Sequence, residues 1–204
     1  MSTKEIILQT ALNLFNENGI NSVTTRSIAT EMGISQGNLQ YHYKNVDTII
    51  EALFSNLTQE FNQLVSALET GEYLAPEELW LSVHRTFPLI YNYRFIFLHF
   101  VEIARRIPAI GKKYAAINSQ RKIQFMAIIH KLVESGYFRK EIPEEQYHHL
   151  ITRLFITADF WLSSNAITGN AKGKNAIKVF TDVFFSNFYP YLTPKGIKKF
   201  YSAQ

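Results

Sequence analysis

The chain has 204 residues, of which 47% are apolar and 14% aromatic, so it can bury a full core and is not intrinsically disordered. It contains no cysteine, which excludes disulfides and thiolate chemistry, and its net charge of +4 permits nucleic-acid binding without indicating it strongly. No apolar run approaches the roughly 18 residues of a membrane span, and the N-terminus lacks the apolar core of a signal peptide. We therefore expect a soluble, cytoplasmic protein.

The first expected element is an amphipathic helix that begins after Ser2. Ser2 and Glu5 have the spacing of a capping box, in which each side chain bonds the backbone N–H of the other residue. Apolar residues then recur at helical spacing until Asn18 and Gly19, which end the helix. Its apolar face needs a partner, and the next stretch of the chain supplies one.

Residues 24–47 predict two short helices joined by a sharp turn. Thr24 is placed to cap the first helix, Gly33 to end it in a left-handed conformation, and Ser35 to cap the second. Only Leu39 and Tyr43 of the second helix point inward. The outward face carries amides, a phenol and an imidazole, which suit base edges in a DNA major groove. The alternative is an ordinary helical hairpin with a solvated polar face.

The charge distribution argues against strong DNA binding by one copy of this hairpin. Up to residue 50 the cations are Lys4, Arg26 and Lys44, and acidic residues outnumber them. Affinity for DNA must then depend on helix N-termini, hydroxyl groups and a few suitably placed cations. Two copies of the domain are therefore needed for useful binding strength.

Further helices account for the rest of the chain. Asn45 can cap a long fourth helix with Asp47 in its first turn, and this helix continues to Gly71. The later helices are expected at 76–90, 93–106, 111–136, 143–162 and 176–189, with a polar loop at 165–173 and a last short turn at 194–201. The sequence therefore predicts an all-α fold, with a three-helix helix-turn-helix domain at 1–46 and a larger helical domain at 47–204. The family resemblance described below implies that this second domain serves ligand binding and dimerisation.

Residues 3–55 resemble the N-terminal domain of the tetracycline-repressor (TetR) family of bacterial transcription regulators. The order and spacing match without a gap at the following residues: Ala11, Leu14, Phe15, Gly19, Thr24, Thr25, Arg26, Ile28, Ala29, Gly33, Ile34, Ser35, Gly37, Leu39, Tyr41, His42, Tyr43, Lys44 and Ile49. The resemblance covers about the first quarter of the chain. The remainder of that family is helical and divergent, and this chain is compatible with it.

The resemblance implies a DNA-binding role for individual residues. Thr24 and Thr25 resemble phosphate contacts, and Arg26 is placed for a phosphate or a guanine. The positions that meet bases in the family are here Gln36, Gly37, Asn38 and Gln40, and those that hold phosphates are Tyr41, His42 and Lys44. Two positions depart from the family pattern. Gln40 stands where an aromatic residue is usual, and Val46 stands where a lysine or another polar residue is frequent.

The family's second domain usually holds an inducer pocket, and the resemblance is the main reason to expect one here. The residues expected to line it are Trp80, His84, Phe87, Phe95, His99, Phe100, Tyr114, Arg121 and Phe125. Such a cavity suits a hydrophobic or aromatic small molecule. The alternative is that these aromatic side chains form an ordinary core.

The helices near 144–164 and 175–190 have apolar faces broad enough for two neighbours. In a homodimer they would form a four-helix bundle, with the following residues as anchors: Phe155, Trp161, Phe180, Phe184 and Phe188. The alternative is that these residues are buried only within one protomer.

We find no sequence signal for an enzyme, a cofactor or a metal site. The chain lacks a phosphate-binding glycine loop and the G-x-S-x-G and H-E-x-x-H motifs, and the adjacent residues His148 and His149 diverge on a helix. The leading hypothesis is a homodimeric repressor that a small hydrophobic molecule releases from a near-palindromic operator. The alternatives are a helical sensor or carrier with a degenerate DNA-binding hairpin, and a protein-interaction module.

Overall fold

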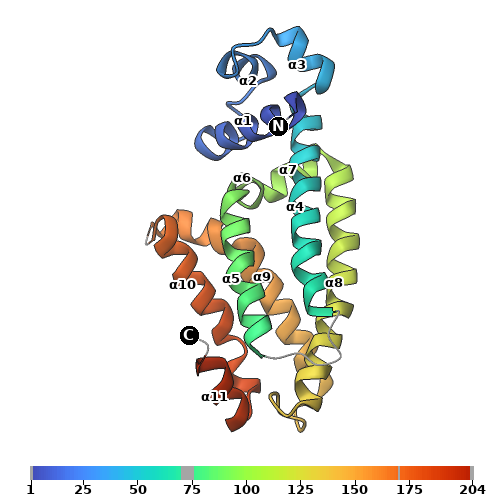
Figure 1. The fold of residues 1–204 in the computed structure, drawn as a ribbon, viewed down its shortest axis with the longest axis vertical. Helices are drawn as coiled ribbons and strands as arrows, with labels where there is room; N and C mark the ends of the chain where they lie inside the picture. Colours follow the sequence, from blue (N-terminus) through green and yellow to red (C-terminus); the bar gives the residue numbers. More distant parts are fainter. Residues whose placement is uncertain (1, 70–75, 170, 203–204) are drawn as a thin grey trace. The chain divides into compact units, whose positions relative to one another are not determined.

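The computed structural model describes residues 2–69, 76–169 and 171–202. Regular structure in these ranges is helical, apart from an isolated bridge between Phe138 and Leu192, which confirms the predicted all-α fold (Figure 1). The elements are α1 (Thr3–Asn18), α2 (Thr25–Glu31), α3 (Gln36–His42), α4 (Val46–Glu69), α5 (Pro76–Asn92), α6 (Arg94–Leu98), α7 (Phe100–Arg106), α8 (Pro108–Glu134), α9 (Glu144–Thr168), α10 (Gly173–Ser186), the 3₁₀ turn η1 (Tyr189–Tyr191) and α11 (Pro194–Ser202). None of the helices in the described ranges is both long and apolar enough to cross a membrane.

The predicted helix caps are present at the N-terminal helices. Ser2 donates its backbone N–H to the Glu5 carboxylate at 2.6 Å, and this bond lowers the pKa of Glu5. The hydroxyl groups of Thr24 and Ser35 cap α2 and α3, as expected. Asn45 accepts the backbone N–H of Thr48 at 3.0 Å and so caps α4. These local bonds fix where each helix begins.

Several helix boundaries differ from those predicted. The element expected at 93–106 is divided at His99, whose φ of −114° and ψ of 21° lie outside the helical range, so α6 and α7 are separate. Helix α8 begins at Pro108 instead of near Gly111, because the first turn of a helix tolerates a proline. Helix α9 includes residues 165–168 of the expected loop and ends at Thr168, before Gly169, whose φ is +66°. Helix α10 begins at Gly173, earlier than the expected Ala176.

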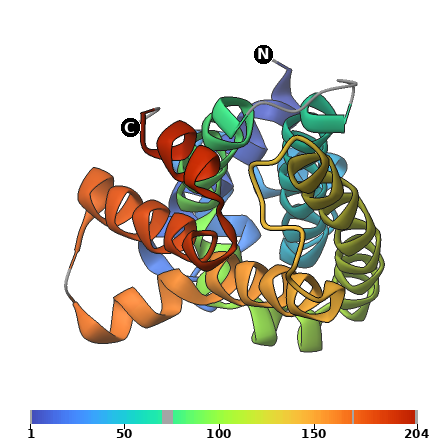
Figure 2. The same cartoon turned by 90° about the horizontal axis from the view of Figure 1, so that it is seen from below.

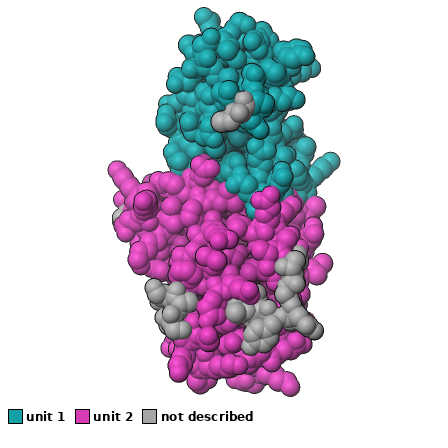
Figure 3. Space-filling view, in the orientation of Figure 1, with its two compact units in different colours: residues 1–60, 93–114 teal, residues 61–92, 115–204 magenta. Residues whose placement is uncertain are grey.

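The chain forms two compact units (Figure 3). The first comprises Met1–Glu60 with Tyr93–Tyr114. It is larger than the predicted 1–46 domain, because α6 and α7 supply part of its core. The Phe95 ring is fully buried and stacks on Phe15 with 4.9 Å between ring centroids. Tyr93 donates to Glu60 at 2.7 Å, and its pKa is raised mainly by burial.

The second unit comprises Phe61–Asn92 with Ala115–Gln204, as far as these residues are described. Helix α10 packs against both α9 and α5, as Figure 2 shows. Aromatic rings fill this interface, where Trp161 of α9 contacts Phe180 of α10 with 4.8 Å between centroids. Helix α11 packs on α5, and Lys199 forms a 2.8 Å ion pair with Glu77 that lowers the pKa of Glu77.

Candidate nucleic-acid interface

Helix α3 presents a polar face supported by one fully buried side chain. Ser35 accepts the backbone N–H of Asn38 at 3.2 Å, which fixes the start of the helix. Leu39 is 0% exposed and anchors α3 to the core of the first unit, whereas Tyr41 is 86% exposed. The predicted base-contacting residues of this helix are all exposed: Gln36, Gly37, Asn38 and Gln40. A Cβ atom on Gly37 would meet no other atom within 4 Å, so the helix surface is open there.

The turn between α2 and α3 is tightly bonded. Gly33 has a φ of +67°, which residues with a side chain rarely adopt. Its N–H donates to Thr30, and the next N–H, of Ile34, donates to Ala29 at 3.0 Å. These bonds satisfy carbonyl groups at the end of α2 and set the direction in which α3 leaves.

Two adjacent threonines at the start of α2 have different partners. The Thr24 hydroxyl accepts the backbone N–H of Ser27 at 3.1 Å, so it serves the helix cap. The Thr25 hydroxyl instead accepts a hydrogen bond from the Gln36 side chain, with 3.2 Å between Nε2 and Oγ1. The neighbouring Arg26 is exposed. The first residue of α3 is therefore bonded to a predicted phosphate contact, Thr25.

The C-terminal end of α3 carries the other predicted phosphate contacts. The rings of Tyr41 and His42 meet edge to face with 5.2 Å between centroids, and Lys44 is exposed. Tyr43 is half-buried, and burial raises the pKa of its phenol.

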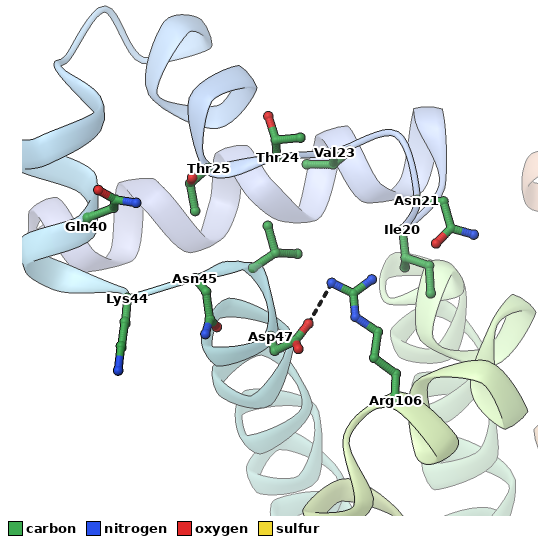
Figure 4. A pocket seen from close by; sticks show the side chains of 11 residues that line it. Ile20, Asn21, Val23, Thr24, Thr25, Gln40, Lys44, Asn45, Asp47 and Arg106 are labelled. Carbon is green, nitrogen blue, oxygen red and sulfur yellow. Dashed lines mark ion pairs between the residues drawn. The ribbon is translucent and has the colours of Figure 1, made fainter.

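A cleft of about 410 Å³ adjoins these residues within the first unit (Figure 4). Its lining comes from the segment between α1 and α2 with the start of α2, from the end of α3 and the segment after it, from the start of α4, and from one residue of α7. The lining residues are Ile20, Asn21, Val23, Thr24, Thr25, Gln40, Lys44, Asn45, Val46, Asp47 and Arg106. Asp47 and Arg106 form an ion pair in it, with 2.7 Å between Oδ1 and Nη2. Four of the predicted DNA contacts, Thr24, Thr25, Gln40 and Lys44, line this one cleft.

Sequence reasoning did not find the residues that attach α6 and α7 to the first unit. Asn16 of α1 accepts the backbone N–H of Phe95 at 3.1 Å, and Asn21 donates to Glu102 at 3.0 Å. Amphipathic periodicity shows which face of a helix is buried but not which residues bond to the end of the helix. The sequence therefore contains no signal for the Asn16–Phe95 and Asn21–Glu102 hydrogen bonds.

Part of the predicted ligand-binding set lies in this first unit. Phe95 is in its core, and the His99 imidazole lies against Gly19, where an added Cβ would be 3.4 Å from Nε2. Phe100 and Tyr114 form an edge-to-face pair with 4.5 Å between centroids. The structure therefore associates these four side chains with the helix-turn-helix unit.

The other predicted ligand-binding residues lie in the second unit. Trp80 stacks on His84, and Phe87 contacts Trp161 and Phe184. Arg121 is only 8% exposed and donates to Asn62 and to Gln124. Phe125 meets Phe155 edge to face. None of the predicted ligand-binding residues lines the 410 Å³ cleft.

The predicted dimer anchors pack largely within their own protomer. Trp161, Phe184 and Phe188 are buried, and Phe155 and Phe180 are half-buried. The exposed apolar side chains of these two helices are instead Ile156, Phe160 and Ile167 on α9 and Val179 and Val183 on α10. Ile156 and Phe160, and likewise Val179 and Val183, are one helical turn apart and lie on one side of their helix.

Comparison with known proteins assigns the family. Residues 56–200 match the family model described as a bacterial transcriptional repressor, and residues 7–53 match that of bacterial regulatory proteins of the tetR family. The chain belongs to the TetR family. This is a family of transcription regulators with a helix-turn-helix, not of enzymes, which agrees with the interpretation of the sequence.

Individual relatives of this TetR-family chain differ in how much they share with it. The tetracycline repressor protein class D of Escherichia coli is 42% identical over 50 residues, covering 24% of this chain and 23% of the relative. The chain thus matches about a quarter of the length of such repressors. The transcriptional repressor KstR2 of Rhodococcus jostii is 22% identical over 195 residues, and this match covers 86% of this chain and 88% of the relative.

The fold also matches a solved structure along its whole length. A TetR-family regulator from Marinobacter aquaeolei has a TM-score of 0.85 and 24% identity, covering 99% of this chain and 97% of that one. At this identity the likeness concerns the fold.

Proposed function

We propose that this chain is a homodimeric repressor that acts in the cytoplasm, binds a near-palindromic DNA operator and is released from it by a small hydrophobic molecule. The exposed polar face of α3 carries this proposal. Its amides project from a helix that Leu39 anchors and Ser35 caps. A short helix held in this way can place its N-terminal residues against base edges in the major groove.

Each DNA-facing residue has a role in the proposal. Phosphates are held by Thr24, Thr25, Tyr41, His42 and Lys44, Arg26 binds a phosphate or a guanine, and bases are met by Gln36, Gly37, Asn38 and Gln40. The open surface at Gly37 supports this assignment, because a helix without a side chain there can approach the DNA closely.

A second copy of the chain is required for useful affinity. We assign the contact between copies to Ile156 and Phe160 of α9 and to Val179 and Val183 of α10, which are 57%, 42%, 41% and 45% exposed. Since α9 and α10 pack together, these side chains can form one apolar face. A near-palindromic operator requires the two α3 helices of the dimer to lie about 34 Å apart, one turn of DNA.

The ligand is assigned to the second unit. Trp80, His84 and Phe87 of α5 belong to an aromatic cluster, and Arg121 provides a buried guanidinium. The aromatic side chains favour a planar or apolar molecule, and a ligand that also binds Arg121 would carry an anionic group. A ligand that binds the DNA-free conformation a hundredfold better shifts the equilibrium by about 2.7 kcal/mol.

A gel-shift titration with the DNA that flanks the protein's own gene tests the proposal. We expect retardation of that DNA by the wild-type chain at low salt. The double substitution Gln36→Ala with Lys44→Ala should abolish it, and the matched pair Gln59→Ala with Lys112→Ala, on α4 and α8, should not. Affinity should fall with salt, and Lys44→Ala should reduce the log–log slope by about one per protomer. Absence of a retarded band, or equal behaviour of the two double variants, would refute DNA binding by α3.

A further inference from the structure

The hydrogen bond between Gln36 and Thr25 has a consequence for base recognition. Gln36 is the first residue of α3, and its Nε2 donates to Thr25 Oγ1 at 3.2 Å. Both side chains belong to the first unit, and each comes from the N-terminal end of its helix. We propose that Thr25 is a positioning residue that fixes the orientation of the Gln36 amide. This orientation determines which base Gln36 binds. The inference rests on the DNA-binding function proposed above.

The inventory of donors and acceptors explains the effect. A threonine hydroxyl has one proton to donate and lone pairs to accept with. When that proton goes to a DNA phosphate, the oxygen can only accept from Gln36. The amide must then direct an N–H at Thr25, because its carbonyl oxygen would find no proton there. A sequence-independent phosphate contact therefore selects one of the two amide orientations.

The selected orientation leaves a defined pair of groups for the groove. One N–H of Gln36 is used by Thr25, so the other N–H and Oε1 remain. Adenine presents an acceptor at N7 and a donor at N6 in the major groove, which that pair can bind together. An amide that is free to flip can exchange its donor and acceptor, and it discriminates less between adenine and other bases.

Thr24 does not position the Gln36 amide, although it directly precedes Thr25 in the chain. Its hydroxyl accepts the backbone N–H of Ser27 and lies 3.4 Å from the Ser27 hydroxyl. Thr24 therefore serves the start of α2, whereas Thr25 is the threonine bonded across the turn to the recognition helix.

The test is a base-substitution series. Duplexes are selected from a random library by the wild-type protein, and each base pair of a half-site is then changed in turn. Affinities are measured by fluorescence anisotropy for the wild type, Thr25→Val, Thr25→Ser, Gln36→Ala and the double variant Thr25→Val with Gln36→Ala. Thr30→Val, an exposed threonine of the same helix, is the matched control. Circular dichroism and the thermal midpoint establish that each variant is folded.

We expect Thr25→Val to weaken binding to every duplex by a common factor and also to flatten the preference at one base pair. That preference should fall by roughly two- to tenfold, as expected for the loss of one neutral hydrogen bond. Gln36→Ala should reduce the preference at the same base pair. In the double variant, Thr25→Val should add only the uniform loss of affinity for all duplexes. Thr25→Ser should retain the preference, and Thr30→Val should change nothing.

A uniform loss in Thr25→Val, with the preference at the Gln36 base pair intact, would overturn the positioning role while leaving DNA binding in place. If the wild-type protein selects no sequence from the library, the proposed function fails and the inference fails with it.

Discussion

Arg106 at the end of α7 and Asp47 in the first turn of α4 form an ion pair with 2.7 Å between Nη2 and Oδ1. The two side chains are 35% and 40% exposed, so the pair contributes at most about 1 kcal/mol to folding. Its position matters more than its strength. Asp47 lines the same cleft as Thr24 and Lys44, and Arg106 cancels its negative charge beside the proposed phosphate contacts (Figure 4).

The substitution Arg106→Ala should lower DNA affinity because it leaves Asp47 uncompensated near the phosphates. Two unit charges about 10 Å apart in water interact by about 0.4 kcal/mol, so the expected loss is about twofold for each protomer and about fourfold for a dimer. Fluorescence anisotropy at low salt measures it. Adding Asp47→Asn should restore affinity, and Arg105→Ala provides the control for loss of a nearby cation. Equal losses in Arg106→Ala and Arg105→Ala would contradict the role of the pair.

The substitution Phe95→Ala should destabilise the first unit. Phe95 is fully buried against Phe15, and removing such a ring costs about 3–5 kcal/mol in free energy of unfolding. Leu98→Ala on the same helix, where the side chain is 37% exposed, should cost about 1 kcal/mol or less. Urea denaturation compares them. Similar values for both variants would argue against a core role for Phe95.

The substitutions Ile156→Asp and Val183→Asp together should convert the dimer into monomers, because they place charges in the proposed apolar contact between copies. Sedimentation equilibrium gives the mass of each species. Ile123→Asp is a matched control, since Ile123 is 74% exposed on α8 and outside the proposed contact. A wild-type monomer, or a double variant that remains dimeric, would refute this assignment of the interface.

Binding of a small molecule should stabilise the second unit and release DNA. We expect some member of a panel of planar aromatic compounds and straight-chain carboxylic acids to raise the thermal midpoint and to reverse the gel shift. For an acid, Arg121→Gln should weaken binding by about tenfold or more, since a hydrogen bond to a charged group is lost. Isothermal titration measures this loss. Unchanged affinity for the acid in Arg121→Gln would exclude Arg121 as the anion contact.

Local features of this chain could be predicted from the sequence. The caps at Ser2, Thr24 and Ser35 and the turn at Gly33 depend on hydrogen bonds and backbone angles within a few residues, and such signals are readable in order along the chain. The buried Leu39 and the exposed face of α3 followed from helical periodicity. The resemblance to the TetR family depends on the fixed spacings of these local features.

The tertiary structure alone decided which neighbour each apolar face meets. Helices α9 and α10 carry apolar side chains on more than one face, so the sequence could not distinguish the buried Trp161 and Phe184 from the exposed Ile156 and Val183. The association of Phe95 with Phe15 and of Arg106 with Asp47 depends on contacts between segments far apart in the chain. Periodicity specifies that a face must be covered, but it contains no information about the segment that covers it.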